Sequence, residues 1–318
     1  MLSLAGRTNH RAIGPAPPRI GGETDFRDVA HRSSLGSIVN SSVGGHSHMP
    51  SGYEPAVQLV LPYFGLFSYS IGRQSWSIDP SKILLVRPGW EYADGQPVKG
   101  LGHACLLLNP AGSIVEEILG SRLSVAAGAA AFGAARSSPN LWLLTQYFLA
   151  QTNEGLTALQ ADEWMIMVLE LATNQPRTSD RPSARVVARA KEFLHEYGFE
   201  RVPLERIARA VGVTPVYLSN EFARSEGVPL YQYQLYLRLI RSLQILRDCD
   251  DITQLALELG FSSHSHFSAT FRQTFGLSPS RYRSNTRSRR SLATARAFGR
   301  LEGIARKTGK PPPSEAVA

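Results

Sequence analysis

The feature that most constrains the fold is a glycine-joined pair of helices that occurs twice in the second half of the chain. In the first copy Ala208 stands four residues before Gly212, and Ala256 and Gly260 repeat this spacing in the second. The glycine permits the left-handed turn that ends a helix, and the small alanine lets the following helix cross closely. A helix, a tight glycine turn and a second helix form a helix-turn-helix unit, so the spacing predicts two such units.

The second helix of each unit has a recognisable start and an inward apolar face. Residues that cap a helix by accepting backbone N–H bonds precede it: Thr214, with Pro215 after it, and Ser262 or Ser263. Apolar residues four apart would hold these helices to the core: Leu218 with Phe222, and Phe267 with Phe271. The pattern therefore predicts recognition helices at about 214–225 and 263–275.

A long helix is expected between the two units, over residues 229–247. At about 1.5 Å per residue it would be roughly 30 Å long, close to the ~34 Å repeat of B-DNA. Two recognition helices at its ends would then enter successive major grooves on one face of the duplex. The alternative is a helical bundle that only resembles this arrangement.

The outward faces of the two recognition helices carry short polar residues, small apolar residues and arginines. Asparagine can form hydrogen bonds with adenine, and serine can form them with either base of a pair. Valine or alanine can contact a thymine methyl group. The base-reading candidates are Val216, Ser219, Asn220, His264, Ser265, Ser268 and Ala269. The candidates for phosphate contact are Arg224, Arg272, Arg281 and Arg283. Solvent exposure without a role is the alternative for each of them.

Positive charge is concentrated in the same half of the chain. Residues 1–180 contain 12 Lys+Arg and 14 Asp+Glu, whereas residues 181–318 contain 22 and 12. A near-neutral half joined to a basic half indicates a polyanionic partner; double-stranded DNA is the usual one and an acidic membrane surface the less favoured one. No stretch approaches the roughly 20 apolar residues of a spanning helix, and no secretory signal is visible, so we expect a cytoplasmic protein outside the membrane.

The first half predicts a small β-rich domain between an arm and two helices. Residues 1–45 are rich in Gly, Pro, Ser and Arg and are predicted to be disordered. Short apolar runs separated by turn signals favour an antiparallel sandwich or barrel, and they occur at 57–61, 66–71, 75–78, 83–86 and 103–108. Helical periodicity follows at 141–148 and 159–171.

The predicted fold is therefore α+β with two domains. A β-rich domain with its helices precedes an all-helical domain, and a short polar linker joins them. The predicted segments are the disordered arm at 1–45, the β-rich domain at 46–176, the linker at 177–183, the helical domain at 184–284 and a basic, Pro-ended tail at 285–318.

Residues 184–283 resemble the DNA-binding domain of the AraC/XylS transcription regulators. The matching stretches are 215–222, Gly227-Val-Pro-Leu, Arg238-Leu-Ile, 252–267, Phe271-Arg, 276–279 and Tyr282-Arg. The resemblance implies a domain of seven helices with two helix-turn-helix units. By alignment, the family's base-reading positions fall on Val216, Ser219, Asn220, His264, Ser265 and Ala269. Ala269 stands where some members carry a long side chain, so the second unit would dock mainly on phosphates.

The first domain is similar to the cupin-like sensor domain of the same family, most closely at 79–89. The resemblance implies that the barrel holds a small effector and that the helices at 138–175 pair two subunits as a homodimer. Aromatic residues would line the effector pocket, and the candidates are Tyr53, Trp76, Trp90 and Tyr92.

A metal site of the cupin kind is not expected. Cupins that bind metal use a His-x-His motif and later ligands. The residues that would imitate this set are His46, His48, Glu54 and His103. Tyr92 stands near where a later histidine is expected, so we predict no metal and no cofactor.

These observations predict a sequence-specific DNA-binding transcription regulator, activator or repressor, and not an enzyme. Its partners would be promoter or operator DNA, an unidentified small-molecule effector and RNA polymerase. One alternative is an enzyme built on the barrel, although residues 50–135 show no carboxylate pair or Ser/His/Asp set of diagnostic spacing. Another is a nonspecific nucleic-acid packing protein, which the basic residues at 281–290 favour.

Overall fold

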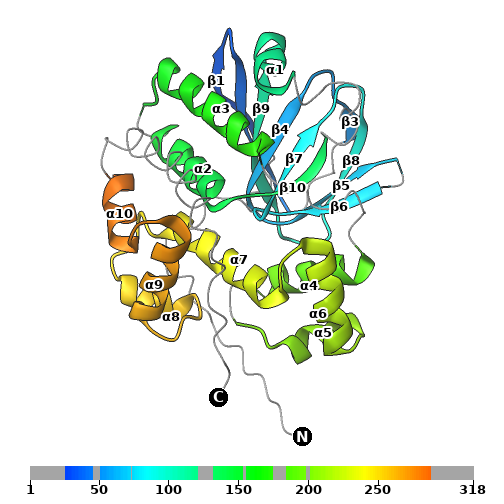
Figure 1. The fold of residues 1–318 in the computed structure, drawn as a ribbon, viewed down its shortest axis with the longest axis vertical. Coiled ribbons are helices and arrows are strands. Elements are labelled where there is room, and N and C mark those ends of the chain that lie inside the picture. The colour runs from blue at the N-terminus through cyan, green and yellow to red at the C-terminus, as the bar shows by residue number, and fades with distance from the viewer. Residues whose placement is uncertain are drawn as a thin grey trace, which may run out of the picture.

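The computed structural model describes residues 26–45, 51–72, 74–120, 132–152, 155–174, 184–197 and 201–287. Within these residues a β-rich part is followed by a helical part (Figure 1). The prediction of an α+β fold with two domains is confirmed. No helix in this described part of the chain is long and apolar enough to cross a membrane.

Two antiparallel sheets form the first domain. The larger has the order β1-β2-β9-β4-β7-β10. Its strands are β1 (Phe26–Ser33), β2 (Gly36–Val43), β9 (His103–Pro110), β4 (Gln58–Phe64), β7 (Lys82–Val86) and β10 (Gly133–Arg136). The smaller has the order β3-β8-β5-β6, with β3 (Ser51–Tyr53), β8 (Glu91–Gly95), β5 (Phe67–Ile71) and β6 (Gln74–Ile78). Leu84 and Val86 of the larger sheet share a core with Ile78 of the smaller, as expected for a cupin-like sandwich.

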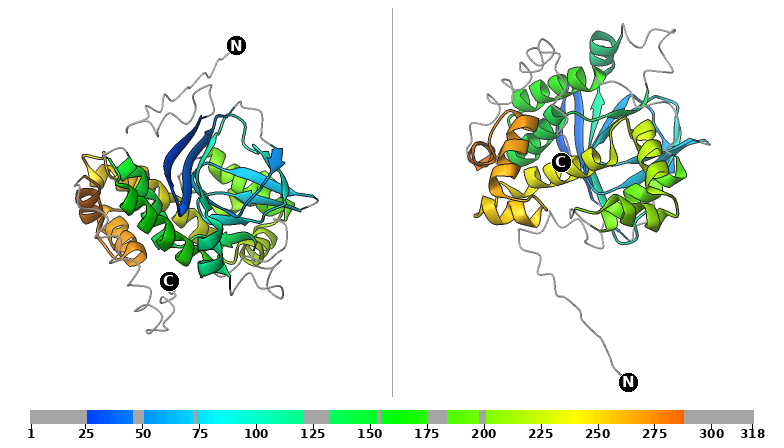
Figure 2. Two further views of the ribbon diagram at one scale, coloured as in Figure 1. Left: turned by 90° about the horizontal axis from the view of Figure 1, so that it is seen from above. Right: turned by 60° about the horizontal axis from the view of Figure 1, so that its bottom comes forward.

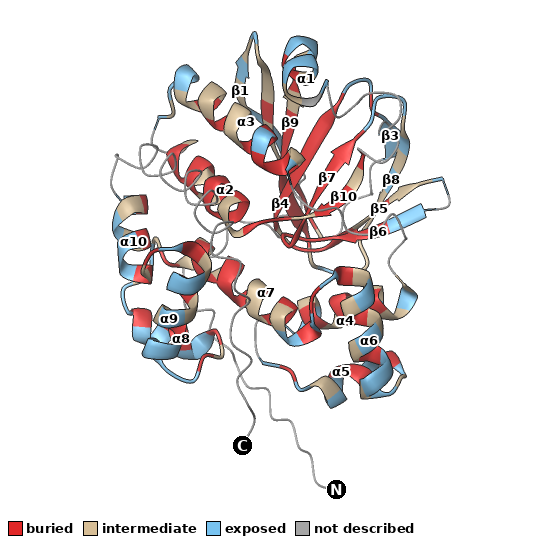
Figure 3. Cartoon of the chain, in the orientation of Figure 1, coloured by how far each residue is buried: buried red, intermediate tan, exposed pale blue. Residues whose placement is uncertain are grey.

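The central strands β4, β7 and β9 are buried on both faces, which explains their nearly continuous apolar sequences. One face lies against the smaller sheet. The other lies against α1 (Gly112–Leu119), α2 (Pro139–Thr152) and α3 (Ala158–Thr173). Leu59 of β4 and Trp164 of α3 belong to this second core. Figure 3 draws much of the larger sheet and of α2 in red, the colour of buried residues.

The structure corrects the prediction of an arm at 1–45. Residues 26–45 contain β1 and β2, a hairpin whose second strand pairs with β9 along its length. The composition pointed to disorder because these strands are polar and lack an alternating apolar pattern, but Ile38 anchors the hairpin in the core. The short strands β3, β8 and β10 were not predicted either. Residues 1–25 lie outside the described part of the chain.

The helices predicted to pair two subunits use their apolar faces within the chain. Leu144 and Phe148 of α2 pack with Trp164 of α3 on the larger sheet. Trp142 and Tyr147, on another face of α2, pack against the second domain. Much of the apolar pattern at 141–171 is therefore explained by this chain's own core, although Leu159 of α3 is 69% exposed. The pairing of two subunits through residues 138–175 stays a prediction.

Seven described helices form the second domain. They are α4 (Arg185–Glu196), α5 (Leu204–Val211), α6 (Pro215–Glu226), α7 (Leu230–Ile245), α8 (Ile252–Glu258), α9 (His264–Phe275) and α10 (Pro279–Arg287). The long helix α7 is shared between two cores: Tyr233 and Leu237 pack with α4 to α6, whereas Leu239 and Leu243 pack with α8 to α10. Figure 2 shows α7, in yellow, running between these two groups of helices.

The helical domain extends past its predicted end at 284. Thr286 is buried, and Arg287 Nε donates to the Arg247 carbonyl at 2.6 Å. These contacts tie the first residues of the predicted tail to the chain just after α7. The predicted linker at 177–183 and the rest of the tail at 288–318 lie outside the described residues.

Candidate nucleic-acid interface

Both predicted glycine turns have the geometry that ends a helix. Gly212 and Gly260 are left-handed, with φ angles of 75° and 73°. In each unit the residue after the glycine donates its N–H, at 3.0 Å, to the carbonyl of the alanine four residues before that glycine. This pair of features is the Schellman closure of a helix, and it requires a residue that tolerates positive φ. The repeat seen in the sequence is thus a repeat of backbone geometry.

The recognition helices α6 and α9 begin at predicted caps. The Thr214 hydroxyl accepts a bond from the Tyr217 N–H at 3.3 Å, and the Ser263 hydroxyl accepts one from the His266 N–H at 3.1 Å. Of the two serines considered, Ser263 is therefore the cap. Ser262 instead places its Oγ 2.9 Å from Nδ1 of His266.

The connecting helix α7 is shorter than predicted. It has 16 residues, so it is about 24 Å long rather than roughly 30 Å. It begins after Pro229 and ends at Ile245, two residues before the predicted end. The two helix-turn-helix units lie at its two ends, with α5 and α6 at one and α8 and α9 at the other (Figure 1).

The seven base-reading candidates lie on the accessible sides of α6 and α9. Val216 is 71% exposed, whereas Leu218 and Phe222 on the inner side of α6 are fully buried. Exposed side chains are those of Asn220, His264, Ser265 and Ala269, and half-buried ones are those of Ser219 and Ser268. Small and polar groups on a helix held from behind by aromatic residues form a surface that can approach a groove.

The four arginines predicted to contact phosphate have different surroundings. Arg272 and Arg281 are exposed. Arg224 makes two hydrogen bonds of 2.7 Å to the Glu221 carboxylate, a partner that a phosphate would have to replace. Arg283 donates to two backbone carbonyls of the loop between α7 and α8, both at 3.0 Å. Arg283 therefore stabilises this loop, a role that the sequence did not indicate.

A buried ionic cluster joins the first helix-turn-helix unit to the β-rich domain. Nζ of Lys191, on α4, lies 2.5 Å from Oδ2 of Asp79 and 3.5 Å from Oε2 of Glu226. Nζ of Lys82, at the start of β7, lies 3.0 Å from Oε1 of Glu226. These four side chains are at most 4% exposed. Two ammonium groups and two carboxylates thus balance one another inside the junction of the domains.

Further polar groups complete this cluster. The Tyr233 hydroxyl donates to Asp79 at 2.8 Å. Burial alone would raise the pKa of Asp79, but the Lys191 ammonium beside it holds that pKa well below its usual range. Burial lowers the pKa of His195, whose Nε2 is 3.9 Å from Asp79, to about 4. At neutral pH the carboxylate is therefore charged and the imidazole is neutral.

Sequence reasoning missed this cluster, although helix periodicity carried a signal for it. Lys191 follows Val187 by four residues and precedes Leu194 by three, and all three are buried on α4. Glu226 follows Phe222 by four residues on the buried side of α6. A charged residue at a core position of an amphipathic helix indicates a buried partner of opposite charge.

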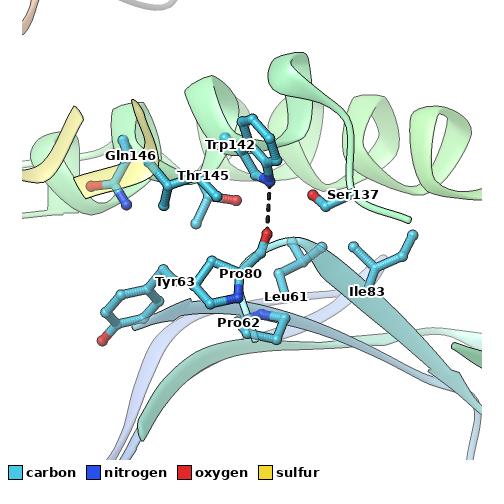
Figure 4. A pocket seen from close by; sticks show the side chains of 10 residues that line it. Leu61, Pro62, Tyr63, Pro80, Ile83, Ser137, Trp142, Thr145 and Gln146 are labelled. Atoms are coloured by element: carbon cyan, nitrogen blue, oxygen red, sulfur yellow. Dashed lines mark hydrogen bonds between the residues drawn. The ribbon is translucent and has the colours of Figure 1, made fainter. Parts of the chain in front are cut away.

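The second unit meets the β-rich domain through aromatic side chains. Trp142 of α2 lies edge-on to Tyr236 and Phe275, with ring centroids 5.4 and 6.3 Å apart. Its indole N–H donates to the Pro80 carbonyl at 2.7 Å, the dashed line in Figure 4. A small pocket lies here between the larger sheet, α2 and Ile240 of α7. Both helix-turn-helix units thus contact the first domain: the first through buried ion pairs and the second through aromatic side chains.

The four aromatic candidates for an effector pocket do not share one environment. Trp76 and Tyr92 contact the core between the two sheets. Trp90 also packs against this core, and its ring lies edge-on to Phe132 with centroids 6.0 Å apart. Tyr53 is 61% exposed on β3 and does not line the interior with the others.

The residues considered for a metal site are only partly described. His46 and His48 lie outside the described residues. Glu54 is buried, and the His103 ring stacks on Phe67 with centroids 4.3 Å apart. Within the part of the chain that the structure covers, no group of three or more His, Cys, Asp and Glu is placed to hold a metal ion.

Two helix-turn-helix units on one connecting helix, each with an exposed polar face, define a DNA-binding domain of the helix-turn-helix class. A family model described as a helix-turn-helix domain matches residues 207–285. The C-terminal part of the chain is an AraC-type helix-turn-helix domain, as its motifs indicated.

Similar proteins include transcription activators. The chain is 26% identical over 156 residues to the HTH-type transcriptional activator RhaS of Escherichia fergusonii, covering 44% of this chain and 56% of RhaS. It is 37% identical over 67 residues to the activator RhaR of Pectobacterium carotovorum, covering 21% and 24%. It thus spans about half or less of these relatives. A solved AraC-type regulator from Chromobacterium violaceum is 31% identical over 33% of this chain and 94% of that chain, with a TM-score of 0.31.

Proposed function

We propose that the chain is a sequence-specific transcription regulator of the AraC/XylS type whose first domain binds a small-molecule effector. The observation that carries this proposal is the pair of capped recognition helices, each held to the core by its inner side and open on its polar outer side. The helix α6 would read one major groove through Val216, Ser219 and Asn220. The helix α9 would read the next through His264, Ser265, Ser268 and Ala269.

Phosphate contacts would provide most of the affinity and fix the register on the duplex. Arg272 and Arg281 are exposed and free to approach the DNA backbone, and Arg224 would exchange Glu221 for a phosphate. Arg283 would act differently, by holding the loop before α8 in place. The concentration of positive charge in residues 181–318 supports this assignment.

The junction between the domains supports a response to an effector. Glu226 is the last residue of the recognition helix α6, and its carboxylate is held by Lys82 of the β-rich domain. The Arg136 guanidinium, on β10, also donates to the Glu226 carbonyl at 3.2 Å. A change in the β-rich domain would therefore move the end of α6, which couples effector binding to DNA binding.

Salt-titrated gel shifts on the DNA upstream of the gene would test the proposal. Asn220→Ala should weaken binding to the specific site by about 1 to 3 kcal/mol, that is roughly 5- to 150-fold, because one base contact is lost. Arg272→Ala should weaken specific and scrambled duplexes alike and reduce the salt slope by about 1. Gln74→Ala, an exposed amide on β6, is the matched control and should change neither.

Equal affinity for the upstream site and a scrambled duplex at physiological salt would contradict sequence-specific binding. A homodimer and a contact with RNA polymerase are further parts of the proposal. The side chains of α2 and α3 that pack inside the chain are not open to a second subunit. A dimer through these helices would use their exposed side chains, such as that of Leu159. Sedimentation of the full chain with and without DNA would measure this.

A further inference from the structure

A row of three side chains crosses the inner face of the smaller sheet. Tyr69 of β5 lies directly opposite Trp76 of β6 on one side and Asp94 of β8 on the other. Directly opposite residues of antiparallel strands point to the same face, with Cβ atoms about 5 Å apart. Tyr69 and Trp76 are in the core between the two sheets, together with Cys105 of the larger sheet. Asp94 therefore points toward the interior of the sandwich.

Two polar atoms of this row are buried without a partner. Among the residues that the structure describes, neither the Tyr69 hydroxyl nor Oδ1 of Asp94 has a hydrogen-bond partner, and both atoms are inaccessible. Tyr69 as a whole is only 4% exposed. Buried polar atoms in native proteins are almost always bonded, so two unbonded atoms on facing residues point to a site for a polar ligand.

The charge around these atoms is negative on balance. Glu54 is 9% exposed, and Arg27 of β1 is the cation that offsets it. Burial and then the charge of Glu54 raise the pKa of Asp94 to about 7, whereas Arg27 lowers it. Burial and then Asp94 raise the pKa of the Cys105 thiol to about 12, so this thiol adds no charge. At about pH 8, above its pKa, Asp94 is therefore ionised.

Aromatic faces lie beside the carboxylates. Tyr92 is two residues before Asp94 on β8 and so shares its face of the sheet. Its ring stacks on Tyr69 with centroids 5.3 Å apart and an interplanar angle of 11°. A carboxylate beside aromatic rings in a desolvated site suits an ammonium group, through a charge-assisted hydrogen bond and cation–π attraction.

We infer that the interior of the first domain at Asp94, Tyr69 and Tyr92 binds a small organic cation. Its ammonium group would donate hydrogen bonds to Asp94 Oδ1 and to the Tyr69 hydroxyl oxygen, and its apolar part would lie against Trp76. This inference rests on the proposed function, because it names the chemical class of the effector. Trp76 and Tyr92 were candidates from the sequence, but Asp94 and Tyr69 were not.

Titration calorimetry of the full chain with benzylamine, and with benzyl alcohol as its neutral counterpart, tests this site. At about pH 8 we expect benzylamine to bind at least tenfold more tightly than the alcohol, because only the charged amine donates a charge-assisted hydrogen bond to the carboxylate. Asp94→Asn should remove this difference. Glu91→Gln, an exposed carboxylate on the same strand, is the matched control and should retain it.

Stability measurements keep the test independent of folding. Asp94→Asn removes a charge whose Oδ1 atom is buried without a hydrogen-bond partner, so the ligand-free variant should melt at the same or a higher temperature than the parent. Tyr69→Phe keeps the ring and removes only the hydroxyl, and it should weaken benzylamine binding severalfold. Equal binding of amine and alcohol, or unchanged amine binding in Asp94→Asn, would overturn the inference. Gel shifts without any amine test the proposed function separately, so the two failures are distinguishable.

Discussion

Replacing Lys191 by methionine would test whether the ionic cluster holds the two domains together. The Lys191 ammonium is fully buried and donates to the Ser77 carbonyl at 3.1 Å, besides its contacts with Asp79 and Glu226. Methionine preserves most of the volume but removes the charge. In the variant, Asp79 would still accept a hydrogen bond from the Tyr233 hydroxyl, and Glu226 would still pair with Lys82. The cluster would then hold two carboxylates and only one ammonium group.

Removing one partner from a buried ion pair typically costs about 3 to 5 kcal/mol, because the remaining charge is left desolvated. We therefore expect Lys191→Met to lower the free energy of unfolding by about that amount. Urea denaturation followed by tryptophan fluorescence measures it, since Trp142 lies at the same junction. Lys99→Met, at an exposed position, is the matched control and should cost less than about 0.5 kcal/mol.

A second variant separates the charge from the packing. Asp79→Asn combined with Lys191→Met removes one charge of each sign, so the double variant should lose less stability than the sum of the two single ones. If Lys191→Met lowered the free energy of unfolding no more than Lys99→Met does, the ionic cluster would not hold the two domains together. Strict additivity of the two changes would contradict that role as well, because interacting charges cannot be additive.

Two further predictions concern pH and the first glycine turn. Burial sets the pKa of His195 at about 4 in the folded protein, below the ~6.5 of an unfolded chain, so stability should fall as pH drops from about 6.5 to about 4, by up to roughly 3 kcal/mol. His195→Gln should reduce the fall in the free energy of unfolding between pH 6.5 and pH 4. His266→Gln, at an exposed position, should leave this fall unchanged. Gly212→Ala should lower the free energy of unfolding by about 1 to 2 kcal/mol in thermal melts, because φ is 75° there and no atom lies within 4 Å of the added methyl. Gly112→Ala, with equally open space and no positive φ, should be within about 0.5 kcal/mol of the parent.

The predicted strands show which parts of the β-rich domain were visible in the sequence. The apolar runs at 57–61 and 83–86 fall in β4 and β7, because strands buried on both faces are apolar throughout. The strands β1 and β2 were missed because an edge hairpin is stabilised by its pairing with β9, and that pairing leaves no apolar period in the local sequence. The order β1-β2-β9-β4-β7-β10 joins strands far apart in the chain, which only the folded structure shows.

The sequence by itself determined the two helix-turn-helix units. Their turns, caps and apolar pairs depend on residues within about ten positions of one another, so local chemistry specifies them. Tertiary structure alone decided where the apolar faces of α2 lie and which partner each buried charge meets. Lys82 and Glu226 are 144 residues apart in the sequence, yet Nζ of Lys82 lies 3.0 Å from Oε1 of Glu226. Asp94 and Tyr69 likewise meet only through strand pairing. Such contacts depend on the path of the whole chain, because the local sequence can mark a charged side chain as buried but cannot identify the distant residue that pairs with it.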